Sequence, residues 1–413
     1  MNRSQIVTTD RNNLVNYDRS YSIHELISIR VRGSEIVAKT VGTEFGDSKS
    51  DTHCAKNINL NIGIKIDLSD DLTMLGDGMF YSENKDAIIT SINKEGVSLR
   101  PDEIELVIEG DPLSVKNKSI SISTSRTTPY EGGLSGGVSR TVADIKADTI
   151  PHIAKNKEER WASMLISSVL HPILYFTLST LNHTFVHAAG LAHDNKGILI
   201  IGHSNVGKTS LALEMVMNGY SFLGDDLVIL SNKSEILSFP KPVKLEGHNI
   251  MERPEVLRRI KERMGPKEKI FFKMLTSYLK NKSRTVSASV SIEDVIENPH
   301  IISRSDLTHV IHIKRYAGHE LVANEISPEE SVKEAALNLF WEFECQEYRN
   351  TKPFYAFKNA HGEDYAAFLE EHHSRIKDIL TASFANVKSY LIEIPTGATT
   401  HDIYGTVKRL LNS

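Results

Sequence analysis

Apolar and polar residues alternate in several short stretches of the first third of the chain. Alternation with a period of two residues is typical of half-buried β-strands, and Gly, Pro, Asn and Asp turn signals separate these stretches. The candidate strands are 27–32, 58–66, 103–108 and 119–123. The pattern predicts a β-rich N-terminal domain over residues 21–150. The polar, Asn-rich residues 1–20 before it have no such periodicity, and we expect them to be disordered.

After residue 155 the pattern changes, because apolar stretches of strand length alternate with longer helical ones. The expected helices cover 157–181, 208–218, 329–348, 362–382 and 400–411. The expected strands cover 183–192, 198–201, 220–223, 227–230, 308–314 and 389–394. Strands that alternate with helices predict an α/β domain over residues 155–413.

A glycine-dense stretch, residues 129–137, lies near the boundary between the two predicted domains. Glycine at this density is typical of a flexible turn or loop. A functional glycine loop is the alternative, but it would need a strand before it and a helix after it, and the surrounding residues predict neither. We therefore interpret the stretch as a connecting loop.

Composition and charge narrow the function classes. The chain has 413 residues, 40% hydrophobic and 24% charged, and its net charge of −5 offers no general attraction to nucleic acid or anionic membranes. Its two cysteines, Cys54 and Cys345, form neither a disulfide framework nor a metal-type spacing, which suits a reducing cytoplasm. The N-terminus lacks the apolar core of a signal peptide, and the most apolar stretch, 164–181, is too polar for a membrane span. These observations favour a cytoplasmic protein that binds neither membrane nor nucleic acid.

Residues 202–209, here called the 202–209 loop, read GHSNVGKT and match the pattern G-x-x-x-x-G-K-[ST]. Glycines let backbone N–H groups turn toward phosphate oxygens, and the N-terminus of the following helix adds a positive field. Lys208 would reach the β- and γ-phosphates, and the Thr209 hydroxyl can bind Mg²⁺. Apolar residues 198–201 before the loop and a helical stretch after it supply the context that this motif requires. The predicted nucleotide-binding residues are Gly202, His203, Ser204, Asn205, Val206, Gly207, Lys208, Thr209 and Ser210.

Two adjacent carboxylates, Asp225 and Asp226, end an apolar run one helix after the 202–209 loop. Phosphoryl transfer needs an acid that manages Mg²⁺, and a second acid often accepts the proton of the attacking hydroxyl. A plain turn is the alternative interpretation of two acids at a strand end. The spacing from the loop favours the functional one.

The 202–209 loop also resembles the first motif of small GTPases. Those proteins place their D-x-x-G motif much farther along the chain, and their guanine-reading N-K-x-D motif farther still. Here the acids follow after one helix, and the segment Asn232-Lys233-Ser234-Glu235 ends in Glu and comes too early. The spacing therefore argues against a GTPase.

The block from His187 to Leu230 resembles HPr kinase/phosphorylase and related serine kinases, which share the phosphoenolpyruvate-carboxykinase type of nucleotide-binding fold. It reads H-A-A-G-L-A, then a turn, I-L-I-I-G-H-S-N-V-G-K-T-S-L-A-L-E-M-V-M-N-G-Y-S-F-L-G-D-D-L-V-I-L. HPr kinases have a His at this distance before the loop, followed by the loop, a similar helix, a glycine and D-D. A weaker similarity extends the match to residue 247. The resemblance implies a kinase domain of this fold that uses ATP and Mg²⁺.

The resemblance also implies roles for single residues. Lys208 would hold the transferring phosphate, and Thr209 and Asp225 would bind Mg²⁺. Asp226, the second acid, would accept the proton of the substrate hydroxyl. His187 would lie close to the reacting phosphate, although a His on an apolar strand is, on sequence grounds alone, more often a structural core residue.

Glu246 is a further candidate Mg²⁺ ligand, because HPr kinases have a Glu in a downstream E-x-R-G signature. That signature is not intact here, since the chain reads Leu245-Glu246-Gly247-His248. The departure puts the protein substrate HPr and the reverse phosphorylase activity in doubt. HPr kinases assemble into oligomers, and the resemblance is compatible with a homo-oligomer here.

Residues 251–284 form a basic insertion that we expect to be helical. Its cations are Arg253, Arg258, Arg259, Lys261, Arg263, Lys267, Lys269, Lys273, Lys280, Lys282 and Arg284. One interpretation is a lid that grips phosphates or an acidic substrate. The other is a solvated helical face whose apolar side packs on the domain.

Two hypotheses about function follow from the sequence. The first is an ATP- and Mg²⁺-dependent kinase that transfers the γ-phosphate to a hydroxyl group, either a serine of a protein or peptide or a small-molecule alcohol. The second is an ATP-binding switch or scaffold without kinase activity, which binds a partner through its N-terminal domain.

Overall fold

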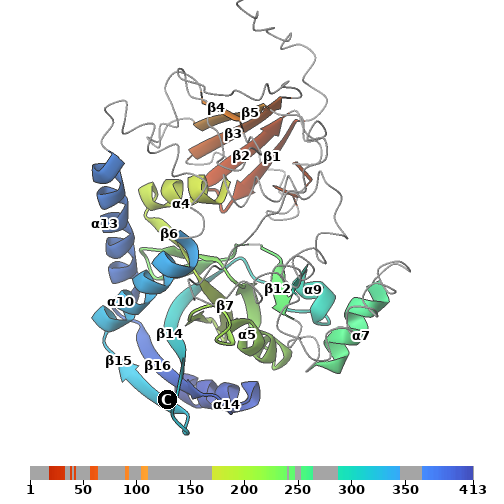
Figure 1. Cartoon of the computed structure of the whole chain (residues 1–413), viewed down its shortest axis with the longest axis vertical. Coiled ribbons are helices and arrows are strands. Elements are labelled where there is room, and N and C mark those ends of the chain that lie inside the picture. Colours follow the sequence, from red (N-terminus) through yellow and green to blue (C-terminus); the bar gives the residue numbers. More distant parts are fainter. Residues whose placement is uncertain are drawn as a thin grey trace, which may run out of the picture. The chain divides into compact units, whose positions relative to one another are not determined.

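The computed structural model describes two compact units of the chain (Figure 1). The first contains residues 1–120, 157–181 and 347–367, and the second contains 121–156, 182–346 and 368–413. The residues that the structure describes are 18–32, 38–39, 41–42, 56–63, 89–92, 104–109, 170–239, 241–246, 253–263, 287–344 and 365–412.

The first unit contains a five-stranded sheet with the order β1-β2-β3-β5-β4. Its strands are β1 (Asp18–Ile23), β2 (Ile27–Arg32), β3 (Lys56–Gly63), β4 (Ile89–Ile92) and β5 (Ile104–Glu109). Strands β2, β3 and β5 are parallel, and the edge strands β1 and β4 pair antiparallel to their neighbours. The strand predicted at 27–32 is present as β2 with the same bounds, and those predicted at 58–66 and 103–108 are present with shifted ends, whereas the stretches 119–123 and 129–137 lie outside the described residues.

The prediction of disorder over residues 1–20 is wrong for its last three residues. Strand β1 begins at Asp18, which pairs with Arg32 of β2. The apolar residues Tyr21 and Ile23 are buried. The strand pairing between β1 and β2 that includes them also includes the polar residues 18–20 before them. The first unit also contains helix α4 (His171–Thr180), the described part of the helix predicted over 157–181.

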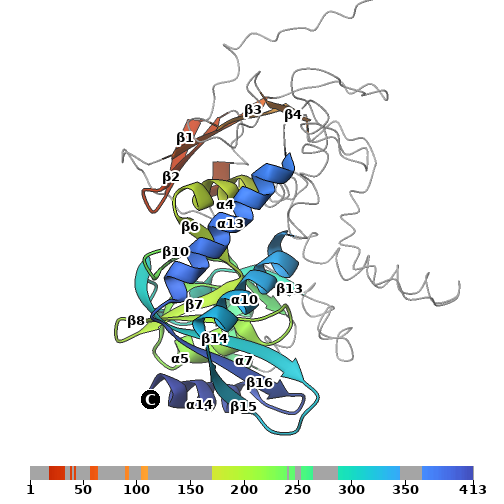
Figure 2. The ribbon, with the colours of Figure 1, turned by 90° about the vertical axis from the view of Figure 1, so that its left-hand side faces the viewer.

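A nine-stranded mixed sheet forms the centre of the second unit (Figures 1 and 2). Its strands are β6 (His183–Val186), β7 (Ala188–His193), β8 (Lys196–Ile201), β9 (Ser221–Gly224), β10 (Val228–Ser231), β11 (Glu235–Leu237), β14 (Arg304–Tyr316), β15 (Val322–Ile326) and β16 (Lys388–Pro395). The main path runs β6-β10-β11-β14-β8-β7-β9, and β16 pairs with β14 and with β15. Strand β14 is parallel to both β8 and β16.

Helices cover both faces of this sheet. Their bounds are α5 (Lys208–Met217), α10 (Pro328–Leu339), α13 (Tyr365–Phe384) and α14 (Thr400–Leu411). Helices α5 and α14 pack together with Ile311 and Ile313 of β14 in one apolar core. His312 lies between these two residues and points to the opposite face, where its Nε2 shares a 2.8 Å hydrogen bond with Ser331 Oγ of α10. The second unit is therefore a layered α/β structure, as the alternation of strands and helices predicts (Figure 2).

The single strand predicted over 183–192 is interrupted at His187. Residues before His187 form β6, which pairs with β10, and residues after it form β7, which pairs with β8 and β9. Strands β9 and β10 are likewise separated by residues 225–227. The two interruptions face each other, because Val186 pairs with Val228 on one side of them and Gly190 pairs with Gly224 on the other.

Smaller elements flank the sheet of the second unit. They are the strand pair β12 (Val243–Glu246) and β13 (Ser287–Val290), and the helices α7 (Pro254–Arg263) and α9 (Ile292–Val295). Helix α7 confirms the helical prediction for part of the basic insertion, and the rest of that insertion lies outside the described residues. Among the residues that the structure places, no helix is both long and apolar enough to traverse a bilayer.

We predict that His312 makes stability depend on pH. Burial lowers the pKa of His312 to about 3. Between the ordinary histidine pKa and this value the unfolded state binds a proton that the folded state does not, so stability falls as the pH falls. His312 alone should lower the free energy of unfolding by about 2 kcal/mol between pH 7.5 and pH 5.

His312→Gln keeps a partner for Ser331 and cannot take up a proton. Denaturant unfolding at several pH values should show a shallower loss of stability for this variant below pH 6.5. His401→Gln, at an exposed position, serves as the matched control. Equal slopes for the wild type and His312→Gln would contradict the assignment.

Candidate functional site

The 202–209 loop connects the end of β8 to the start of α5. Gly202 passes close to β14, since a Cβ atom at this position would lie 2.6 Å from the carbonyl oxygen of Ile313. Gly207 has a φ of 114°, a left-handed conformation that favours glycine. The first glycine thus fixes the loop to the sheet, and the second turns the chain into the helix.

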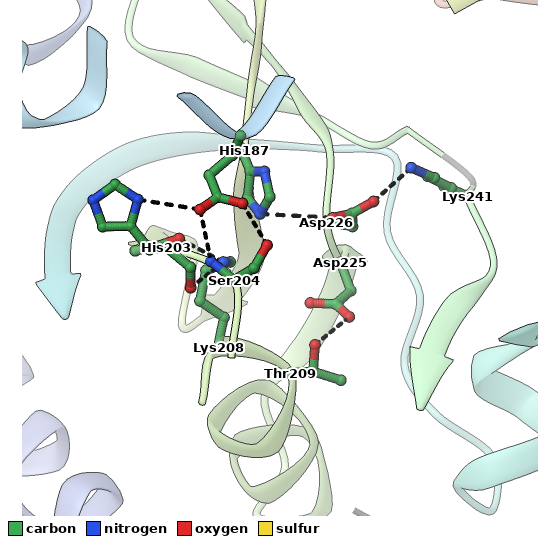
Figure 3. A network of polar contacts seen from close by, with 10 residues as sticks. His187, His203, Ser204, Lys208, Thr209, Asp225, Asp226 and Lys241 are labelled. Carbon is green, nitrogen blue, oxygen red and sulfur yellow. Dashed lines mark hydrogen bonds and ion pairs between the residues drawn. The ribbon is translucent and has the colours of Figure 1, made fainter. Parts of the chain in front are cut away.

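Lys208, the first residue of α5, directs its side chain back along the loop. Its ammonium group donates hydrogen bonds to the carbonyl oxygens of Gly202 and His203, at 2.5 and 3.1 Å. Burial lowers the pKa of Lys208, and the carboxylates of Asp225, Asp226 and Glu342 act against that shift. A buried cation therefore lies inside the loop, on the same side as Asp225 and Asp226 (Figure 3), and the charge of Glu342 also acts on it.

Asp225 is almost completely buried at the end of β9 and contacts the start of α5. Its Oδ2 accepts a 2.8 Å hydrogen bond from the Thr209 hydroxyl, while its Oδ1 has no hydrogen-bond partner among the described residues. Burial raises the pKa of Asp225 to about 6, and the neighbouring charge of Asp226 adds to the shift.

A divalent cation fits this pair of residues. An unsatisfied, buried carboxylate oxygen beside a hydroxyl offers two hard oxygen ligands, and Mg²⁺ characteristically takes one or two protein ligands and completes its shell with water and phosphate oxygens. No group of three His, Cys, Asp or Glu side chains with metal-site geometry occurs in the described part of the chain. Glu246 ends β12, and its side chain lies outside what the structure describes, so its role as a ligand stays a prediction.

Asp226 occupies the gap between β9 and β10 with a φ of 73°, a left-handed conformation that is strained for a non-glycine residue. One carboxylate oxygen accepts a hydrogen bond from the ammonium group of Lys241, and the other lies 3.6 Å from His187 Nε2. Burial alone would raise the pKa of Asp226, but the charge and hydrogen bond of Lys241 act together with His187 and Lys208 to lower it. Asp226 is therefore ionised at neutral pH.

His187 lies in the opposite gap, between β6 and β7, and its side chain faces Asp226 (Figure 3). Burial and the nearby charge of Lys208 lower the pKa of His187 to about 4. The imidazole is thus neutral at physiological pH, and Lys241 is the cation that pairs with Asp226. The structure brings together His187, Lys208, Thr209, Asp225 and Asp226, which the sequence predicted as site residues.

Sequence reasoning missed three residues at this site. Lys241 follows β11 and pairs with Asp226. Arg315 extends from β14, and its guanidinium would lie 3.9 Å from a Cβ atom at Gly207. Glu342 accepts hydrogen bonds from the loop residues His203 and Ser204. A lysine close behind the D-D pair was a signal that could have identified Lys241, whereas nothing in the local sequence around Glu342 indicates a partner 138 residues away.

The described part of the basic insertion shows contacts with the domain. Arg253 is buried, and its guanidinium donates a 3.1 Å hydrogen bond to the carbonyl oxygen of Ser210 and lies 3.5 Å from the carboxylate of Glu214. Arg259 pairs with Glu297 at 3.1 Å. These cations fix α7 to its neighbours, and the idea of a lid depends on residues outside the described part.

A family search matches residues 179–251 to the "HPr Serine kinase C-terminal domain". This segment contains His187, the 202–209 loop, the D-D pair and Lys241. The HPr kinase/phosphorylase of Mycoplasma mycoides subsp. mycoides SC is 44% identical over 48 residues, which cover 12% of this chain and 15% of that protein. The resemblance predicted from the sequence is confirmed for this segment, and the match spans less than two thirds of the relative's length.

Among solved structures, the Hpr(Ser) kinase/phosphatase from Coxiella burnetii is similar to this chain. The alignment has 11% sequence identity and covers 55% of this chain and 94% of that one, with a TM-score of 0.24.

We predict that Asp225→Asn stabilises the protein in the absence of divalent cations, by up to about 3 kcal/mol, because it removes a buried charge. The variant should gain little further stability from Mg²⁺ and nucleotide, since one ligand of the cation is lost. Thermal unfolding with EDTA and with Mg²⁺-nucleotide measures both effects.

Asp378→Asn, which removes an exposed carboxylate on α13, is the control for charge alone. An Asp225→Asn variant that is less stable than the wild type in EDTA would contradict the prediction that the buried charge is costly.

Proposed function

We propose that this protein is an ATP- and Mg²⁺-dependent kinase that transfers the γ-phosphate to a hydroxyl group. The observation that supports this most directly is the different environment of two adjacent acids beside one phosphate-loop motif. Asp225 is buried against Thr209 with an unsatisfied oxygen, and Asp226 is held ionised by Lys241. Phosphoryl transfer needs an acid that manages the metal and often uses a second one at the acceptor, and these two environments suit those roles.

The metal side of the site would consist of Thr209 and Asp225. When bound there, Mg²⁺ supplies positive charge that neutralises the β- and γ-phosphate oxygens. The loop residues orient the triphosphate through their backbone N–H groups and the N-terminus of α5. Lys208 adds a cation at the junction between the β- and γ-phosphates, for which its ammonium group has to leave the carbonyl oxygens of Gly202 and His203.

The acceptor side would consist of Asp226, assisted by Lys241 and His187. Asp226 accepts a hydrogen bond from the attacking hydroxyl and takes its proton as the oxygen–phosphorus bond forms and the bond from the γ-phosphorus to the bridging oxygen breaks, which releases ADP. A strong base is not needed, because the transition state of phosphoryl transfer is loose and depends mainly on position and charge. Lys241 keeps Asp226 ionised, and the neutral His187 can hydrogen-bond to the phosphate or to Asp226 without adding charge.

The acceptor is a serine of a protein or peptide, or a small-molecule alcohol. The likeness to the HPr serine kinase domain and to the HPr kinase/phosphorylase of Mycoplasma mycoides favours a protein or peptide hydroxyl. The altered E-x-R-G signature at Leu245–His248 argues against assigning HPr itself as the substrate. A cytoplasmic location fits such a kinase, since ATP and reduced cysteines belong to that compartment.

Asp226→Asn tests the proposal. We expect at least about a 100-fold loss of phosphoryl transfer, since the variant loses the group that accepts the proton and keeps the local shape. ATP affinity should stay the same or increase slightly, because a negative charge near the γ-phosphate is removed. Transfer from γ-labelled ATP to protein, peptide and metabolite fractions, followed by mass spectrometry, measures the first effect, and calorimetry measures the second.

Asp194→Asn is a matched control, because Asp194 also has a positive φ and lies exposed in the β7–β8 turn. It should keep full activity. Transfer by Asp226→Asn at a near wild-type rate would show that Asp226 is not the proton acceptor. A protein that forms no phosphorylated product, and binds a partner only in the presence of nucleotide, would instead be an ATP-dependent switch.

A further inference from the structure

Glu342 lies against the 202–209 loop from a distant part of the second unit. Its Oε1 accepts a 3.0 Å hydrogen bond from the backbone N–H of Ser204 and lies 3.2 Å from His203 Nδ1. Its Oε2 accepts a hydrogen bond from the Ser204 hydroxyl. The side chain is 13% exposed, so this carboxylate is largely withdrawn from water. One end of the loop is therefore already bound to an anion that belongs to the chain itself.

The segment that carries Glu342 is built to hold it there. Residues Phe340–Glu344 continue α10 as a single π-helical turn, an uncommon conformation that often marks functional sites. Phe343 is buried with its ring 5.8 Å from that of Phe185, and Glu344 pairs with His373 of α13 at 2.9 Å. These two contacts fix the turn against β6 and α13. The exposed Trp341, at 56%, adds no anchor.

The charges around Glu342 are those that would surround a phosphate group. Burial alone would raise its pKa, but the hydrogen bonds from the Ser204 hydroxyl and backbone N–H lower it below the ordinary value, so the group is ionised at neutral pH. Its charge acts on Lys208 and on His187, two residues of the proposed transfer site. A carboxylate thus occupies the place where loop donors, a lysine and a histidine converge.

The position along the loop indicates which phosphate this place would receive. In loops of this pattern the later N–H groups and the start of the helix surround the α- and β-phosphates, while the lysine reaches onward to the γ-phosphate. The ammonium group of Lys208 lies at the carbonyl oxygens of Gly202 and His203, next to Ser204. Ser204 and His203 are therefore on the side of the terminal phosphate, and Glu342 holds both.

We infer that Glu342 is a specificity-determining residue that competes with the γ-phosphate for Ser204 and His203. This inference rests on the proposed function. A nucleoside diphosphate fills the later part of the loop and leaves the contacts of Glu342 intact, whereas a triphosphate has to displace the carboxylate. Glu342 therefore weakens triphosphate binding relative to diphosphate binding and couples entry of the γ-phosphate to movement of the π-helical turn.

Glu342→Gln separates this competition from a purely structural role, because the amide oxygen of Gln still accepts from Ser204 while the negative charge is lost. We expect the Kd of a non-hydrolysable ATP analogue to fall about tenfold, since a charge-assisted hydrogen bond no longer opposes binding. The Kd of ADP should change by less than about twofold. Calorimetry on the full chain with Mg²⁺ measures both constants, and Glu329→Gln at the exposed start of α10 is the control.

Two outcomes would overturn the inference. They are an unchanged ratio of the two Kd values in Glu342→Gln and weaker binding of the analogue. Failure of the proposed function has a different signature. A wild-type chain that binds neither nucleotide would contradict the nucleotide site itself. A Lys208→Met variant that binds both nucleotides as tightly as the wild type does would contradict it too.

A second measurement does not depend on a change at Glu342. The chain has two tryptophans, Trp161 and Trp341, so a Trp161→Phe variant reports fluorescence from Trp341 alone, next to Glu342. The ATP analogue should change this signal and ADP should not, since only the triphosphate moves the turn. Identical responses to both nucleotides, or no response to a bound analogue, would overturn the inference.

Discussion

Two opposed interruptions in the sheet of the second unit are the constraint on which the site depends. Strand β6 pairs with β10, and β7 pairs with β9. The first pairing ends at Val186 and Val228, and the second begins at Gly190 and Gly224, so the two segments do not pair with each other between these positions. His187 fills one gap, and Asp225 with Asp226 fills the other. Because β7 also pairs with β8, which leads into the 202–209 loop, the gap lies beside the loop. The polar side chains can lie within this apolar sheet because the backbone in the two gaps does not take part in strand pairing, so its N–H and C=O groups are not needed for the sheet.

Burial and one cation then give two neighbouring carboxylates different properties. Asp225 is withdrawn from water, so its proton affinity rises in spite of the hydrogen bond from Thr209, and a divalent cation would relieve the cost of its charge. The side chain of Asp226 is 35% exposed, and Lys241 compensates its charge and lowers its proton affinity. The left-handed backbone at Asp226 turns the two side chains apart, so one faces Thr209 and the other faces His187. The strain at Asp226 is thus part of what separates a metal position from an acceptor position.

The sequence predicted the local parts of this site and missed the distant ones. The 202–209 loop and the D-D pair are read from contiguous residues whose chemistry is fixed by type and spacing, and the strand–loop–helix order around them was correct. The strand over 183–192 was predicted as continuous, because its uniform apolar pattern does not show that its two halves pair with different partners. Glu342 was missed for a similar reason, since it lies in a helical stretch and reaches the loop through the tertiary contacts of Phe343 and Glu344. Contacts between distant segments leave no periodic pattern in a single sequence.

A loop that gathers N–H donors and a lysine around one place is costly to leave without an anion, and the chain meets that need with its own carboxylate. The hydrogen bonds that Ser204 now makes to Glu342 are those that it would make to a terminal phosphate. The free energy by which Glu342 stabilises the free protein is therefore subtracted from the free energy of triphosphate binding. A tighter nucleotide site would therefore come with a less stable free loop. The balance can shift only if the π-helical turn releases Ser204, and its anchors at Phe343 and Glu344 set how much free energy that release requires.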